Sequence, residues 1–261
     1  MPDYAKLIVD LDGTLYRGQE AIPGAVEAMS RLRTSRSILF LSNNGNHAPA
    51  RLTERLHRLG FAIEPKEIIC SLQLIVEAVS EMGSGQRVFT VSSGDLDDAL
   101  EEAGHRVVQN GRADVVVAGV DWTFSYEKLR HALRALSSGA MLIGANWDAT
   151  YPTEAGPQPA AGVFVGAMKG MGFTPAHLCG KPDPWAMRRA FEIRGFSPGP
   201  DCLLVGDRLD ADIHGAQAIG IDSVVVLSGV TSERQAREFF PSPTYIADSI
   251  ADVPGIIAGG E

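Results

Sequence analysis

Residues 7–15 read Leu-Ile-Val-Asp-Leu-Asp-Gly-Thr-Leu, and this stretch decides the fold. Three apolar residues lead into two acids and a glycine, which is typical of a buried parallel strand that ends in a polar turn. Asp10 and Asp12 are two residues apart, so in an extended chain both carboxylates leave the same face. Open α/β sheets bind ligands at the carboxyl ends of their strands. The stretch predicts a carboxylate pair at such an edge, although alone it also fits a solvated turn or a structural calcium loop.

The composition is that of an ordinary globular protein. The 261 residues are 45% hydrophobic and 21% charged, which is enough for one large domain or two modest ones. The net charge of -9 and the lack of a basic patch argue against a nucleic acid partner. Three separated cysteines indicate free thiols in a reducing compartment. With no signal peptide pattern and only short apolar runs, we expect a cytoplasmic protein without a membrane partner.

Strand-like and helix-like segments alternate along the chain, which predicts a mostly parallel sheet. The predicted strands are 6–9, 37–41, 68–70, 88–91, 106–108, 115–118, 141–143, 202–205, 221–227 and an edge strand at 244–246. The predicted helices are 23–32, 49–59, 72–82, 95–103, 126–136, 211–218 and 232–239. Residues 151–162 are rich in Pro, Gly and Ala, and we predict a long loop there.

Four polar stretches carry the candidate chemistry. They are Asp10–Thr14, Ser42–Asn44, Gly180–Pro184 and Gly206–Asp212. Three of them directly follow a predicted strand, where residues distant in sequence converge. A short segment separates Asp12 from Ser42, whereas the segment from Asn44 to Lys181 is long enough for a whole α/β domain.

This ordered set of motifs resembles the haloacid dehalogenase superfamily, and within it the C2-capped, nitrophenylphosphatase-like phosphatases. The resemblance covers nearly the whole chain. It implies a Rossmann-like, doubly wound core over residues 1–84 and 176–261, with an inserted α/β C2 cap over residues 85–175. Gly83-Ser84-Gly85 is the expected hinge into the cap.

The resemblance implies phosphoryl transfer, which needs a nucleophile, in-line geometry and charge neutralisation. Asp10 is the expected nucleophile, forming an aspartyl-phosphate, and Asp12 the expected general acid and base. Mg²⁺ is the expected cofactor, bound by the side chain of Asp10, the backbone carbonyl of Asp12 and the side chain of Asp207. A helix N-cap is the alternative role of Asp207.

Further residues are expected around the phosphate. Ser42 and Asn43 offer a hydroxyl, an amide and a backbone N–H, and Lys181 adds a compact positive charge. A polar turn and a surface lysine are the alternatives for these three. Asn44 and Asp212 are expected to support the site from behind, with Asp212 orienting Lys181 or a metal-bound water rather than binding the metal directly.

Asn146, Trp147 and Asp148 match the position of the substrate-facing cap loop of the family, although Trp147 replaces a proline that is common in relatives. We expect them to set substrate specificity. Trp147 either stacks on a ring of the substrate or packs in the cap core. A full cap favours a small substrate, since closure excludes bulk. The resemblance also allows a homodimer through the cap.

We therefore expect a Mg²⁺-dependent phosphomonoesterase that acts on a small phosphorylated metabolite such as a sugar, polyol or nucleotide phosphate. The alternatives are a phosphotransferase or mutase of the same fold, and a catalytically silent sensor of phosphorylated metabolites. The presence of both Asp10 and Asp12 argues against the sensor, and Thr14 weakly favours hydrolysis.

Overall fold

The computed structural model describes residues 3–153 and 156–259, which form two compact units. Over these described residues, the first unit takes in 3–42, 49–69 and 181–259, and the second takes in 43–48 and 70–180. The second unit is thus larger than the predicted cap of residues 85–175, whose boundaries stay a prediction. The chain passes between the units at residues 42–43, 48–49, 69–70 and 180–181.

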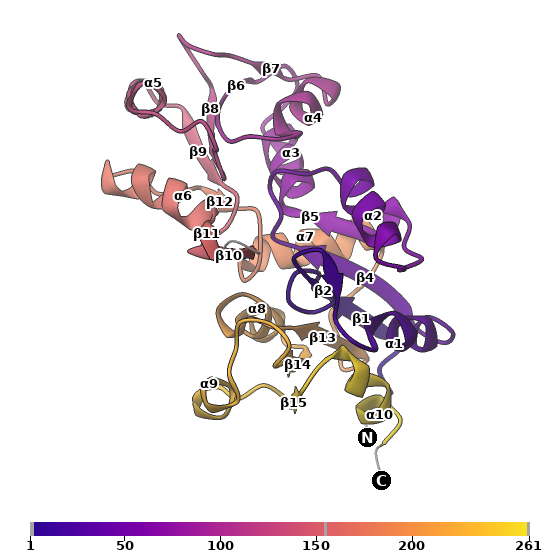
Figure 1. Cartoon of the computed structure of the whole chain (residues 1–261). Helices are drawn as coiled ribbons and strands as arrows, with labels where there is room; N and C mark the ends of the chain where they lie inside the picture. The colour runs from indigo at the N-terminus through magenta and orange to yellow at the C-terminus, as the bar shows by residue number, and fades with distance from the viewer. Residues whose placement is uncertain (1–2, 154–155, 260–261) are drawn as a thin grey trace. The chain divides into compact units, whose positions relative to one another are not determined.

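The first unit is built on a six-stranded sheet in the order β15-β14-β13-β1-β4-β5 (Figure 1). The strands are β1 (Lys6–Val9), β4 (Ser37–Ser42), β5 (Ile68–Cys70), β13 (Cys202–Gly206), β14 (Asp222–Val226) and β15 (Tyr245–Ala247). Pairing from β15 through β4 is parallel. Leu7, Ile8 and Val9 of the central strand β1 are all fully buried, as expected for an apolar strand inside a parallel sheet. The predicted doubly wound α/β architecture is confirmed, and β15 lies at the predicted edge.

The helices of this unit are α1 (Ala25–Leu32), α2 (Pro49–Arg58), α7 (Pro184–Arg194), α8 (His214–Ile219), α9 (Glu233–Glu238) and α10 (Val253–Ile257). Helix α1 packs against α10, and α7 packs against α8. A short hairpin of β2 (Tyr16–Arg17) and β3 (Glu20–Ala21) follows β1. This hairpin places residues 16–21 directly after the acidic turn.

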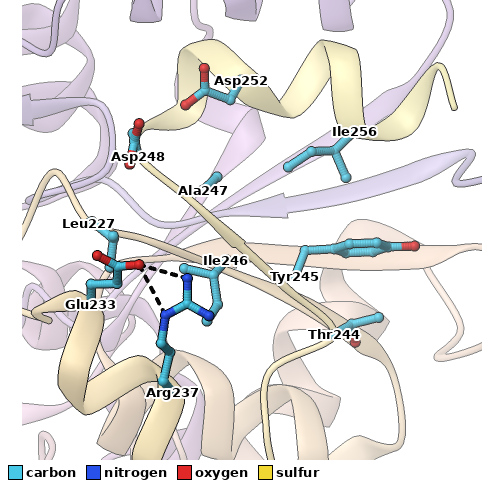
Figure 2. A pocket seen from close by; sticks show the side chains of 10 residues that line it. All are labelled: Leu227, Glu233, Arg237, Thr244, Tyr245, Ile246, Ala247, Asp248, Asp252 and Ile256. Atoms are coloured by element: carbon cyan, nitrogen blue, oxygen red, sulfur yellow. Dashed lines mark hydrogen bonds and ion pairs between the residues drawn. The ribbon is translucent and has the colours of Figure 1, made fainter. Parts of the chain in front are cut away.

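A groove of about 650 Å³ lies beside the edge strand β15 (Figure 2). The ion pair between Arg237 and Glu233 of α9 forms part of its lining, with Nη2 and Oε1 2.7 Å apart. Its lining residues lie between Leu227 and Ile256, outside the four candidate stretches. The groove is therefore distinct from the predicted site.

The second unit has its own parallel sheet, in the order β12-β9-β8-β6-β7 (Figure 1). Its strands are β6 (Arg87–Val91), β7 (Arg106–Val107), β8 (Val115–Ala118), β9 (Met141–Gly144) and β12 (His177–Leu178). Its helices are α3 (Ser71–Glu81), α4 (Leu96–Glu102), α5 (Tyr126–Ser137) and α6 (Ala161–Gly170). Phe89, Val116, Leu142 and Met168 belong to its hydrophobic core.

The predicted long loop at residues 151–162 is wrong. The strands β10 (Thr150–Thr153) and β11 (Gly156–Pro159) form an antiparallel hairpin there, and α6 begins at Ala161. Prolines and glycines suggested a loop, but a separate two-stranded hairpin has few ladder bonds for a proline to remove. At Gly162, a Cβ would lie 2.5 Å from the carbonyl oxygen of Trp147, so close backbone packing requires glycine inside this helix.

The other predicted elements are present with small changes at their ends. The helix predicted at 211–218 begins as a π-helical turn, Leu209–Ile213, and continues as α8. The β2–β3 hairpin, helices α6 and α10 and the short strand β12 were not predicted. Among the described residues, no helix is both long and apolar enough to cross a membrane.

Shortening a buried side chain of the central strand β1 should destabilise the first unit. We expect Ile8→Ala to lower the free energy of unfolding by about 2–5 kcal/mol, because it removes fully buried methyl groups and leaves a cavity. Ile193→Ala makes the same chemical change on α7, where the side chain is 40% exposed, and should cost far less. Urea unfolding followed by circular dichroism compares the two variants, and equal midpoints would contradict this placement of Ile8.

Candidate active site

Three of the candidate stretches meet at one edge of the first sheet. Asp10 follows β1, Ser42 ends β4, and Asp207 follows β13. These strands are neighbours in the order β13-β1-β4 and run parallel, so their carboxyl ends lie together. All three side chains are buried, so Ser42 is not part of an ordinary solvated turn.

Lys181 joins this edge from the segment before α7. Its Nζ lies 2.5 Å from Oδ1 of Asp10 and 2.8 Å from Oδ1 of Asp212, and it donates a hydrogen bond to the carbonyl oxygen of Leu41 at 2.7 Å. Lys181 is only 3% exposed, so it is not a surface lysine. One ammonium group thus bridges two buried carboxylates.

The buried acids outnumber the buried base. One ligand oxygen each from Asp10, Asp207 and Asp212 lies within 4.8 Å of the others. With three carboxylates and the single ammonium of Lys181, full ionisation would leave an excess of negative charge in a medium that solvates it poorly.

The pKa values reflect this imbalance. Burial, followed by the charge of Asp212, raises the pKa of Asp207 to about 7. Burial also raises the pKa of Asp10, against the opposing effect of the Lys181 ammonium. Burial alone would lower the pKa of Lys181, but the carboxylates of Asp10 and Asp212 outweigh it and raise that pKa. Lys181 therefore stays charged, while burial favours the protonated forms of Asp10 and Asp207.

The Asp207 carboxylate has the features of a metal ligand. Its Oδ2 accepts a hydrogen bond from the backbone N–H of Val230 at 2.8 Å, whereas its Oδ1 is buried without a hydrogen-bond partner among the described residues. The backbone crowds this group, since a Cβ at Gly229 would lie 1.8 Å from Oδ2 and one at Gly13 would lie 2.4 Å from it. Close packing fixes the carboxylate, and an all-oxygen set of donors suits a hard cation such as Mg²⁺.

Asp212 lies within the π-helical turn that follows β13 and is fully buried. Its Oδ2 accepts a hydrogen bond from the backbone N–H of Arg208 at 2.9 Å, while Oδ1 faces Lys181. A Cβ at Gly206 would lie 2.2 Å from the carboxyl carbon of Asp212, so a glycine is needed there. By contrast, Asp210 pairs with Arg208 and has an exposed side chain, as expected for a solvated residue.

Asp12 is only partly buried and has a partner that the sequence analysis missed. The hydroxyl group of Tyr16 donates a hydrogen bond to Oδ2 of Asp12 at 2.8 Å. Tyr16 is almost fully buried, and burial together with the charge of Asp12 raises its pKa, so its hydroxyl stays protonated. Thr14 donates to Oδ2 of Asp10 at 3.4 Å. Neither contact leaves a periodic signal in the sequence, because both lie within one irregular turn.

The remaining predicted residues belong to the second unit. The side-chain amide of Asn43 donates to Oδ2 of Asp148 at 3.0 Å, and that of Asn146 donates to the carbonyl oxygen of Asn43 at 2.8 Å. Asn44 closes the adjoining turn, since its Oδ1 accepts from the backbone N–H groups of Asn46 and His47. Asn146 and Asp148 therefore hold the segment that begins at Asn43.

Trp147 stands apart from these polar contacts. Its side chain is 39% exposed, and the Lys169 ammonium lies 5.4 Å from the centre of one of its rings. It does not pack in the core of this unit, which was one of the two predicted roles. An exposed indole is available to a ligand.

Comparison with known proteins gives consistent results along the chain. A family model described as haloacid dehalogenase-like hydrolase matches residues 7–106, and one described as HAD-hydrolase-like matches residues 178–253. The acid sugar phosphatase of Staphylococcus aureus is 32% identical over 247 residues, which cover 94% of this chain and 95% of that protein.

Solved structures agree with these matches. The p-nitrophenyl phosphatase from Archaeoglobus fulgidus has a TM-score of 0.88 and 31% identity, over 97% of this chain and 98% of that one. The glycerol phosphate phosphatase from Mycobacterium tuberculosis in complex with magnesium has a TM-score of 0.86 and 34% identity, over 95% of this chain and 75% of that one. With the acidic motifs placed as described above, the chain belongs to the haloacid dehalogenase superfamily, in its subclass of p-nitrophenylphosphatase-like phosphatases.

Proposed function

We propose that this chain is a Mg²⁺-dependent phosphatase that hydrolyses a small sugar or polyol phosphate through an aspartyl-phosphate on Asp10. The observation that carries the proposal is the ammonium of Lys181, 2.5 Å from one oxygen of Asp10. It fixes that carboxylate at the carboxyl end of the central strand, and a fixed carboxylate is a suitable nucleophile for phosphorus. The buried acids around it supply ligands for a cation.

In the first step, an oxygen of Asp10 attacks the phosphorus atom and the bond from phosphorus to the leaving oxygen breaks. Asp12 gives its proton to that oxygen, so the leaving group departs as a neutral alcohol. The hydroxyl of Ser42 and the ammonium of Lys181 bind oxygens of the phosphate, together with the neighbouring Asn43. Positioning and charge neutralisation provide most of the catalysis in such a reaction.

In the second step, Asp12 takes a proton from water and the resulting oxygen attacks the same phosphorus. The bond between Asp10 and phosphorus breaks, which releases inorganic phosphate and restores both carboxyl groups. Before Asp10 reacts, Lys181 is charged, because the carboxylates of Asp10 and Asp212 hold its pKa above the ordinary value. Asp212 orients the Lys181 ammonium through their 2.8 Å contact.

The residues that would hold Mg²⁺ are the side chains of Asp10 and Asp207 and the backbone carbonyl of Asp12. The unpartnered Oδ1 of Asp207 and the excess of buried carboxylates over ammonium groups support this choice among the described residues. When bound, the cation supplies charge neutralisation and favours the ionised carboxylates.

The substrate class rests on the relatives and on the second unit. The relatives named above include phosphatases of sugar phosphates and glycerol phosphate. The exposed ring of Trp147, which follows Asn146 and precedes Asp148 in the sequence, supports a role of this loop in specificity. A homodimer through the cap stays a prediction, and the exposed Trp122 and Tyr126 of the second unit are apolar surface that such a contact would cover.

Asp12 should matter most when the leaving group needs a proton. We expect Asp12→Asn to slow the hydrolysis of glycerol phosphate by about 10²–10⁴-fold, the usual contribution of a positioned acid-base group. The loss should be much smaller for p-nitrophenyl phosphate, whose leaving group departs as a stable anion. Steady-state kinetics on both substrates test this, and equal losses would exclude the role.

Metal binding should depend on Asp207 but not on its exposed neighbour Asp210. We expect Asp207→Asn to abolish the rise in melting temperature that Mg²⁺ gives to the wild-type protein, because it removes a charged ligand. Asp210→Asn makes the same change on a side chain that is 69% exposed, and should keep that rise.

The metal affinity should also fall as the pH is lowered through about 7, since the pKa of Asp207 is raised to about 7 and its protonated form cannot bind the cation. Calorimetric titration with Mg²⁺ at several pH values measures this. A Mg²⁺ effect that survives in Asp207→Asn would contradict the proposed ligand set.

A further inference from the structure

The buried hydroxyl of Tyr16 has no part in the mechanism above, yet it contacts the general acid. It donates to Oδ2 of Asp12 at 2.8 Å, across the turn that follows β1. Asp12 is only partly buried, so packing alone does not fix the rotation of its carboxyl group, which is intrinsically broad. Tyr16 therefore contacts the catalytic group whose orientation decides where the proton is delivered.

Tyr16 is itself held firmly. Its backbone carbonyl accepts a hydrogen bond from the N–H of Gly13 at 2.8 Å, and it pairs with Ala21 in the β2–β3 hairpin. The centre of the Arg55 guanidinium lies 4.4 Å from the centre of its ring. Arg55 also donates to the carbonyl oxygen of Gly18 at 2.5 Å, which ties α2 to the hairpin. Because the ring of Tyr16 is buried and the Arg55 guanidinium lies over its face, the position of the hydroxyl is fixed.

We propose that Tyr16 is a positioning residue for Asp12, which holds the carboxyl group of the general acid in the orientation for proton transfer. The inference rests on the proposed role of Asp12. A hydroxyl both donates and accepts hydrogen bonds, so the contact persists whether Asp12 carries its proton or has passed it to the leaving oxygen. Arg55 acts one step further away, by clamping the ring of Tyr16.

The direct test is Tyr16→Phe, which removes the hydroxyl and keeps the ring beneath Arg55. We expect kcat for glycerol phosphate to fall roughly 10- to 100-fold, as a misplaced catalytic group does, with KM nearly unchanged. The loss should be much smaller for p-nitrophenyl phosphate, since its leaving group does not need the proton of Asp12. A merely structural role of Tyr16 would lower both activities alike.

Tyr4 provides a matched control. It is as buried as Tyr16, it lies in the same unit, and its hydroxyl donates to Oδ2 of Asp222 at 2.7 Å. Tyr4 precedes β1, whereas the acidic turn follows that strand. Tyr4→Phe therefore removes an equivalent tyrosine–aspartate hydrogen bond at the opposite end of the strand. It should keep both activities and their ratio.

A double-mutant cycle separates the inference from the function on which it rests. In the Asp12→Asn background, Tyr16→Phe should cause no further loss on glycerol phosphate, because the group it positions is gone. If Asp12→Asn discriminates between the two substrates but Tyr16→Phe does not, the inference is overturned and the role of Asp12 stands. If Asp12→Asn lowers the activity on both substrates equally, the proposed role of Asp12 and the inference about Tyr16 are both contradicted.

A second variant guards against a folding defect in Tyr16→Phe. Arg55→Gln keeps the tyrosine and removes the guanidinium that clamps it, and should show the same selective loss at a smaller size. Melting temperatures of all variants show whether each is folded. An Arg55→Gln protein that loses both activities equally, or neither, contradicts the chain of contacts from Arg55 through Tyr16 to Asp12.

Discussion

The bridge that the Lys181 ammonium makes between Asp10 and Asp212 is the interaction on which the site depends. An ion pair in the interior costs desolvation, which is offset only when every charge is paired and hydrogen-bonded. Here the Lys181 ammonium also donates a hydrogen bond to the carbonyl oxygen of Leu41 at 2.7 Å. The backbone N–H of Arg208 donates a hydrogen bond to Oδ2 of Asp212 at 2.9 Å.

The charges that Lys181 leaves unbalanced have a consequence for stability. Folding raises the pKa of Asp207 from its ordinary value of about 4 to about 7, so without a cation the folded state keeps a proton that the unfolded state has lost. The free energy of unfolding of the metal-free protein therefore falls as the pH rises between these two values. A divalent cation would remove that cost, which links metal binding to the stability of the first unit.

Much of this site could be predicted from the sequence because strands and their ends have strong signals. Asp10 and Asp207 each follow an apolar run, and parallel strands bring such ends together. Tyr16 could not be found in this way, since its contact with Asp12 crosses an irregular turn without periodicity. The loop predicted at residues 151–162 was wrong for a related reason. Proline and glycine are typical of loops, and the sequence does not show where close backbone packing requires a glycine. Gly162, which lies against the backbone of Trp147, is a clear example.

The two units differ in the chemistry that they hold. The first contains the acids and Lys181, whereas the second contains the polar contacts between Asn43 and the loop at Asn146 and Asp148. Ser42 and Asn43 are joined by one peptide bond at a point where the chain passes from one unit to the other. The segment proposed to bind phosphate is therefore continuous with Asn43, which contacts Asn146 and Asp148.

The proposed mechanism depends above all on Asp10 as the nucleophile. The most direct measurement is an acid quench during turnover with Mg²⁺, followed by digestion and mass spectrometry of the peptide that contains Asp10. We expect one added phosphoryl group on Asp10 in the wild-type protein and none in Asp10→Asn, which should also be inactive. Steady turnover without any phosphoryl group on that peptide, or an active Asp10→Asn protein in which no deamidation has occurred, would contradict it.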